Sequence, residues 1–262
     1  MLNRWNSSLL LLSIALGTPG ICAAQDRQPL QIKVGDPMVD GAILKPYKNL
    51  WKMSILTRDG KTVPDLGTWS DELDVVKIAG REYLRRTQIA HFIRDGQPLG
   101  ETKTVNVFDP KTLAPVSRWF ERHTSKGGDS VVKIDFGLRS LKMESTENGK
   151  TETKDVPVDV PAYDFYGGLY GIVLTAFPLE EGFFASFSSF GETDISPQPV
   201  TFKVTRSEVA DAGPRGKMKT WVVLADTTDG PMKFWLSREA PYIIRLEYND
   251  KRSGTQWTYA MI

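Results

Sequence analysis

Hydrophobic and polar residues alternate along most of the chain after residue 46. Within residues 130–138, Val132, Ile134 and Phe136 share one face of an extended segment, while Lys133 and Asp135 share the other. A period of two is the pattern of a strand with one buried face. The same alternation recurs in about a dozen segments, and it predicts a chain built mainly of β-strands.

Short turn sequences separate these segments. Most of them place a glycine after a small or polar residue, which is the composition of tight hairpin turns. Hairpins that follow one another in this way predict a large antiparallel curved sheet or half-barrel, an up-and-down meander, over residues 47–262. The turn pairs are Asp59-Gly60, Ala79-Gly80, Asp95-Gly96, Asp109-Pro110, Gly127-Gly128 and Asn148-Gly149.

One segment departs from the alternation. Residues 162–177 carry two overlapping apolar stripes at helical spacing and no charge from Phe165 onward. Asp164 is placed to cap the first turn, and Pro178 ends the segment. The stripes therefore predict one helix, residues 162–177, buried on most sides against the concave face of the sheet. Three glycines (Gly167, Gly168 and Gly171) weaken this helix but let another backbone come close.

The first 24 residues have the organisation of a secretory signal peptide. Arg4 provides a basic start, residues 9–16 are apolar, and Cys22-Ala23-Ala24 offers small residues before Gln25. A lipoprotein with Cys22 as the modified residue is the alternative, against which the bulky Ile21 argues. Residues 25–46 are expected to form an N-terminal arm, of which residues 25–34 are polar and loose.

Charge and cysteine content narrow the functional classes. The chain has 33 basic and 32 acidic residues, and loss of Arg4 with the signal peptide leaves 32 of each. A neutral exported chain gives no electrostatic basis for binding nucleic acid. The single cysteine, Cys22, also leaves with the signal peptide, so the mature chain needs a core that is stable without disulfides. We expect a periplasmic or secreted protein with no transmembrane segment after cleavage following Ala24.

Three stretches together resemble a known family. NVFDPKTLAPVSRWFE, YDFYGGLYGIVLTAFPLEEG and WVVLADTTDGPMKFWLSREAPYIIRLEY are similar to bacterial envelope proteins grouped as domain of unknown function 3108. That group resembles the lipoprotein carriers LolA and LolB in broad design, although those carriers place several helices over the sheet and this chain offers one. The resemblance implies a curved antiparallel sheet with a helix against its open face. It carries over no catalytic or binding residue.

Motifs of enzyme chemistry are missing from the sequence. There is no Gly-x-Ser-x-Gly elbow and no phosphate-binding glycine loop. His91 is expected to be a partly buried strand residue, and neither it nor His123 lies at metal-ligand spacing from a second histidine or cysteine. The cluster of Arg81, Arg85 and Arg86 reads as a solvated strand face. We therefore predict no catalytic residue, no metal site and no cofactor.

Aromatic strand residues and the predicted helix supply the candidate site. A sheet of this size is able to enclose a ligand between itself and the helix. The chain is predicted to bind an apolar ligand, such as a small hydrophobic molecule or lipid, or an envelope protein partner in this groove. Two alternatives stay open, a hydrolase with a site assembled from distant strands and a structural envelope-assembly factor. The predicted ligand-binding residues are Phe165, Tyr166, Leu169, Tyr170, Val173, Trp221, Trp235 and Tyr242.

The signal peptide gives a first testable prediction. Material exported by a bacterial host should have the mass of an unmodified chain that begins at Gln25, because the Cys22-Ala23-Ala24 site is cleaved after Ala24. Intact-mass measurement checks this. A lipid-modified species that begins at Cys22 would contradict it.

Overall fold

The computed structural model of the 262-residue chain describes residues 28–125, 127–191 and 195–262. In this part of the chain, fifteen strands form one sheet. The predicted signal peptide, residues 1–24, lies outside the described residues. The strands are β1 (Leu30–Ile32), β2 (Tyr47–Leu56), β3 (Thr62–Ile78), β4 (Arg81–Arg94), β5 (Gln97–Phe108), β6 (Pro115–Thr124), β7 (Gly128–Phe136), β8 (Ser140–Glu147), β9 (Lys150–Pro157), β10 (Phe184–Phe190), β11 (Pro197–Asp211), β12 (Lys217–Asp226), β13 (Met232–Leu236), β14 (Ile243–Asp250) and β15 (Thr255–Met261).

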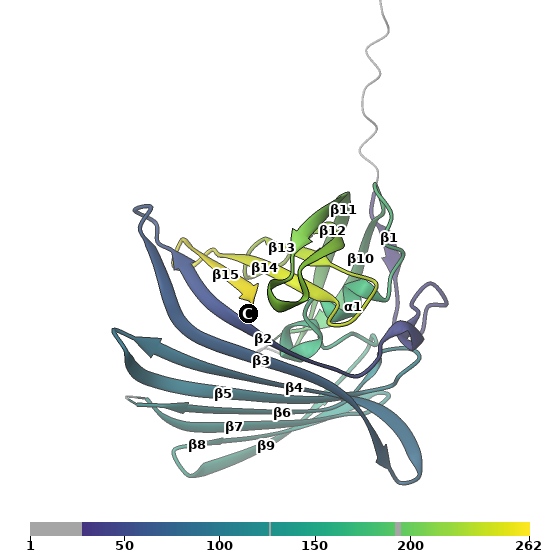
Figure 1. Cartoon of the computed structure of the whole chain (residues 1–262). Coiled ribbons are helices and arrows are strands. Elements are labelled where there is room, and N and C mark those ends of the chain that lie inside the picture. Colours follow the sequence, from purple (N-terminus) through teal and green to yellow (C-terminus); the bar gives the residue numbers. More distant parts are fainter. Residues whose placement is uncertain (1–27, 126, 192–194) are drawn as a thin grey trace, which may run out of the picture.

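Two meanders make up the sheet. One runs from β2 to β9 and the other from β10 to β15, and the last strand of the second pairs with the first strand of the first. Figure 1 shows β2–β9 as one long curved layer and β10–β15 as a second group of strands that lies across from it. The predicted mainly β, curved antiparallel sheet is confirmed. It departs from one continuous meander, because the β15–β2 pairing joins its two halves.

Hairpin turns account for the long strands of the first meander. Both central residues of three predicted turns have positive φ, which is the conformation of the type I′ turn and matches the twist of paired strands. Glycine takes the second position of each turn, where it adopts positive φ without steric cost. The three turns are Ala79-Gly80, Asp95-Gly96 and Asn148-Gly149.

The predicted loose arm is ordered over the residues that the structure describes. β1 pairs in parallel with β10, so Ile32 lies opposite Phe187 and is buried. Val39 and Leu44 are buried as well, on either side of the single turn η1 (Gly41–Ile43). Apolar residues spaced along a polar segment anchor it to the edge of the sheet, and this spacing is what the prediction overlooked.

The predicted helix 162–177 is replaced by two short turns. η2 (Phe165–Leu169) is a π-helical turn of five residues and α1 (Ile172–Thr175) is an α-helical turn of four. Gly168, inside η2, has φ +154°, and Tyr170, between the two turns, is also non-helical, so one continuous helix does not form. Asp164 does not cap the segment through its side chain, because its carboxylate is bound by residues of the sheet. We call residues 162–177 the plug.

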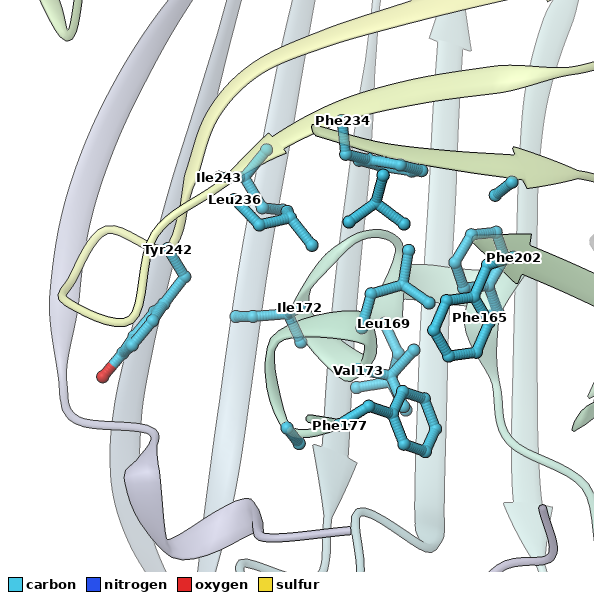
Figure 2. Packing of buried hydrophobic residues seen from close by; sticks show 14 of the residues in the cluster. Phe165, Leu169, Ile172, Val173, Phe177, Phe202, Phe234, Leu236, Tyr242 and Ile243 are labelled. Atoms are coloured by element: carbon cyan, nitrogen blue, oxygen red, sulfur yellow. The ribbon is translucent and has the colours of Figure 1, made fainter. Parts of the chain in front are cut away.

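The plug lies inside the curve of the sheet, as predicted, and the main core surrounds it. Phe165, Leu169, Val173 and Phe177 are at most 1% exposed. Figure 2 shows them packed toward Phe202, Phe234, Leu236 and Ile243 from strands of the second meander. The Phe177 and Phe202 rings stack with centroids 5.1 Å apart. Core contacts of this kind hold the segment in place even though its helical turns are too short to be stable alone.

Side chains close the sheet into a barrel-like shape. β1 and β9 are the two ends of the strand order. A second cluster nevertheless joins the two sides, since Ile134, Leu141, Ala162 and Phe190 pack together. Tyr163 also bridges to Ser189 of β10 through backbone hydrogen bonds. A further single turn, η3 (Gly213–Arg215), lies between β11 and β12. No helix in the described ranges is long and apolar enough to cross a membrane.

The burial of the plug gives a prediction about stability. Leu169→Asp should lower the free energy of unfolding by more than about 3 kcal/mol, because an unpaired charge enters the core. Leu138→Asp is the matched control, since Leu138 is 97% exposed. Chemical denaturation of both variants measures the difference. Equal unfolding midpoints would show that the plug is not part of the core.

Candidate functional site

A cavity of about 560 Å³ lies beside the plug, between the two meanders. This volume is within the range of about 300–1,000 Å³ that is typical of ligand sites. The first meander lines it with β2–β8, the second with β13–β15, and the plug contributes Tyr166, Gly167 and Tyr170. The cavity therefore occupies interior space of the barrel that the plug does not fill.

Regular strand pairing arranges the lining residues of the first meander in rows. Gln88 of β4 lies opposite Thr104 of β5, which lies opposite Phe120 of β6. Neighbouring rows are two residues apart along each strand, or about 7 Å. The inner row is Arg86, Asn106, Arg118, Ile134 and Met143, the middle row is Gln88, Thr104, Phe120, Val132 and Ser145, and the outer row is Ala90, Thr102, Arg122, Ser130 and Glu147.

The remaining wall, formed by β2, β3, β13–β15 and the plug, is apolar and aromatic. Met53, Met232 and Leu246 line it together with Trp69 and three tyrosines. The Trp69 and Tyr259 rings meet edge to face with centroids 5.0 Å apart. Flat aromatic surfaces and flexible methionines are suited to cover an apolar chain. The three tyrosines are Tyr170, Tyr248 and Tyr259.

The inner row closes one end of the cavity through a buried ion pair with the plug. Arg118 Nη1 lies 3.0 Å from Asp164 Oδ1, and Asn106 Nδ2 donates to Asp164 Oδ2 over 2.8 Å. All three side chains are buried. Burial raises the pKa of Asp164 above its ordinary value, while Arg118 and Asn106 oppose that rise by stabilising the carboxylate. The pair fixes the start of the plug against the sheet.

A second buried pair holds the middle of the plug. Arg86 donates to both oxygens of Asp71 over 2.7 Å and, through Nη1, to the carbonyl of Gly168 over 2.7 Å. Burial alone would lower the pKa of Arg86, but the charge of Asp71 and its hydrogen bonds raise it, so the guanidinium stays charged. The close approach needs a glycine, because a Cβ at Gly168 would lie 1.8 Å from Asn106 Oδ1.

Tyr47 completes this group with a protonated phenol. Its hydroxyl donates to Asp71 Oδ2 over 2.6 Å. Burial raises the pKa of Tyr47 well above its ordinary value; Asp71 adds to that rise, and Arg86 opposes it. The Asp71 carboxylate thus accepts hydrogen bonds from Arg86 and Tyr47 and is neutralised within the barrel.

The outer row is the open end of the cavity. Arg122 and Glu147 are exposed there, in contrast to the buried Arg118. Among the described residues neither of them forms an ion pair. Charged side chains at an open mouth keep their hydration, so they cost little where they stand.

The structure brings two of the eight predicted site residues to the cavity, Tyr166 and Tyr170. Phe165, Leu169 and Val173 point into the core instead, as Figure 2 shows. They cannot touch an occupant of the cavity without displacement of the plug. The eight predicted residues therefore do not line one common cavity in this structure.

The three predicted strand residues lie away from the described cavity lining. Trp235 packs beneath Lys233 and Arg245 and donates its indole hydrogen to Glu208. Trp221 lies beside Lys219. Tyr242 is buried, and its hydroxyl donates to the carbonyl of Ile43 over 2.9 Å. Its role in this structure is to tie the N-terminal segment to β14.

Sequence reasoning missed most of the cavity lining and also misplaced a buried arginine next to the plug. Arg86 was grouped with Arg81 and Arg85 as a solvated face, yet its side chain is fully buried. Alternation contained a signal, since Leu84, Arg86 and Ala90 share one face of β4 while Arg85 lies on the other. Alternation alone does not identify Asp71 as the ion-pair partner of Arg86, because the two residues become neighbours only through the pairing of β3 and β4.

Neither histidine lies in the cavity lining. His91 was expected to be partly buried, but it is exposed and pairs with Glu101 over 2.9 Å. His123 is exposed and pairs with Glu121 and Asp129, and these carboxylates raise its pKa. The described residues contain no group of three or more His, Cys, Asp or Glu side chains that could hold a metal ion.

The buried pair gives a second stability prediction. Arg86→Met should lower the free energy of unfolding by about 3–5 kcal/mol, because it leaves the Asp71 carboxylate buried without its countercharge. Arg85→Met is the control, since Arg85 pairs with Asp74 at the surface and its loss should cost at most about 1 kcal/mol. Adding Asp71→Asn to Arg86→Met should recover part of the loss. Equal effects at both positions in a denaturation experiment would contradict this role.

Comparisons with known proteins agree with the fold. A search of the curated proteins finds no match. A solved structure titled as a β-barrel-like protein of domain of unknown function DUF1849, from Brucella abortus, superposes with a TM-score of 0.53 at 10% identity, over 88% of this chain and 97% of that one. At this identity the likeness shows the fold alone. The family model described as "Protein of unknown function (DUF3108)" matches residues 84–251, and this chain therefore belongs to the DUF3108 family.

Proposed function

We propose that this protein is a non-enzymatic binding protein of the cell envelope, which holds the apolar chain of a small molecule or lipid in the cavity beside the plug. The observation that carries the proposal is the cavity itself, about 560 Å³ in volume, with an aromatic and methionine-rich wall and an open end. A core that only needed to be filled would leave no space of this size, because protein interiors pack with few voids.

The free energy of transferring an acyl chain from water into the cavity is large enough to support such binding. Removing an acyl chain of ~10 methylenes from water contributes roughly 8 kcal/mol. Loss of ligand freedom takes part of this away, and the remainder is enough for micromolar affinity. The plug does not have to move for an occupant to enter, because the Arg118–Asp164 ion pair and the hydrogen bond from Arg86 to the Gly168 carbonyl hold it in place. We therefore place the ligand beside the plug, rather than under it.

The hydrolase alternative has less support. Its site would need a histidine paired with a carboxylate inside the cleft. Both histidines do pair with carboxylates, but at exposed positions outside the described cavity lining. The signal peptide and the absence of cysteine from the mature chain support a periplasmic location for the binding protein.

Filling the cavity tests the proposal. Val132→Trp adds bulk in the middle row and should weaken binding of a fluorescent fatty-acid probe at least about ten-fold, because the chain loses its space. Val105→Trp is the control, since Val105 follows Thr104 on β5 and faces away from the cavity. Probe fluorescence titration measures both variants beside the parent protein.

Native mass spectrometry supplies a second measurement. Protein purified from envelope extracts without detergent should carry bound material that Val132→Trp lacks. A parent protein that is free of ligand and that also fails to enhance the probe would overturn the proposed function.

A further inference from the structure

Gln88 is a buried polar side chain that the protein leaves incompletely bonded. It is 4% exposed, sits in the middle row and lines the cavity. Its Nε2 atom is itself buried and has no hydrogen-bond partner among the described residues, so the side-chain amide turns about its last bond to meet a group in the cavity. A buried donor without an acceptor carries an unrepaid desolvation cost, so each such group needs an explanation.

No acceptor on the neighbouring strands bonds this amide. Asp71 lies opposite Gln88 on β3, but its carboxylate accepts from both Arg86 and Tyr47. On the other side Gln88 faces Thr104, which also lines the cavity. The free acceptor that Gln88 needs can therefore come from the occupant of the cavity.

The two walls differ in what they offer an occupant. Met53, Met232 and Leu246 on one wall provide apolar surface. Gln88, Thr104 and Ser145 on the middle row of the other wall provide hydrogen-bonding groups. A plain hydrocarbon would satisfy the first wall and leave the amide of Gln88 unpaired. A molecule with an oxygen acceptor would satisfy both.

We infer that the occupant is an amphiphile, an acyl chain with an ester or carboxyl carbonyl that accepts a hydrogen bond from Gln88 Nε2. The chain lies against the methionine and aromatic wall. Any head group beyond the carbonyl points past the outer row, about 7 Å nearer the open end, where Arg122 is exposed. This inference rests on the proposed function and names its ligand class.

Two probes that differ in one oxygen test the inference. 1-Monododecanoylglycerol has an ester carbonyl, and 1-O-dodecylglycerol has an ether with the same chain and head group. Each is titrated against the protein loaded with a fluorescent fatty-acid probe. The parent protein should prefer the ester about ten-fold, because only the ester supplies the acceptor that Gln88 lacks.

Substitution of Gln88 should remove the preference. Gln88→Met keeps the length of the side chain but has no amide, so the two affinities should agree within about two-fold. Gln97→Met is the control on an exposed glutamine and should keep the preference of the parent. Circular dichroism and the unfolding midpoint verify that each variant folds. If Gln88→Met does not fold, Gln88→Leu also removes the amide donor and should also abolish the preference.

The outcomes separate the inference from the proposed function. Equal affinity of the parent for ester and ether, or a preference that survives loss of the amide, overturns the inference and leaves the cavity as a site for apolar chains. Failure of both glycerol compounds to displace a bound probe also overturns the inference. Failure of the fatty-acid probe itself to bind overturns the proposed function and the inference together.

Discussion

Two buried arginines of the sheet, Arg86 and Arg118, bind the plug and are the constraint on which the interior depends. Arg86 with Asp71, and Arg118 with Asp164, lie fully inside the barrel, where an uncompensated charge would cost several kcal/mol. The geometry of each pair is therefore strictly defined, and Arg86 also takes the carbonyl of Gly168. The plug follows the positions of these arginines, and Gly168 breaks its helical geometry where Arg86 and Asn106 approach, so it forms two short turns instead of one helix.

Fixing the plug on one side of the barrel leaves the other side open. A sheet of fifteen strands encloses more space than the side chains of its own inner face can fill. The plug and the aromatic residues around it fill the part next to β10–β14. The second hydrophobic cluster, in which Phe136 of β7 packs against Phe190 of β10, then holds the two meanders together where their strands do not pair. The cavity is what remains between these two constraints.

Local features of this fold were predictable from the sequence, and features that depend on strand pairing were not. Alternation and turn pairs such as Asn148-Gly149 act over a few residues, so the mainly β fold and its hairpins followed from them. The position of the plug was predicted correctly, but its conformation was not. Gly168 contacts Arg86 and Asn106, which come from strands remote in the sequence and hold it in a non-helical conformation. Tyr166 and Tyr170 were predicted because they belong to the plug. The position of Gln88 in the cavity lining depends on the register of β3, β4 and β5, which the sequence does not show.

The inner surface of the first meander orders its polar groups by the cost of removing them from water. Charged residues of the inner row are buried in ion pairs, Arg118 with Asp164 of the plug and Arg86 with Asp71 of β3. The middle row has neutral groups, Gln88, Thr104 and Ser145, whose burial costs less than that of a charge. Unpaired charges occur in the outer row, at the open end. This order along the strands allows one sheet face to hold a plug at one end and to present a moderately polar wall to the cavity at the other.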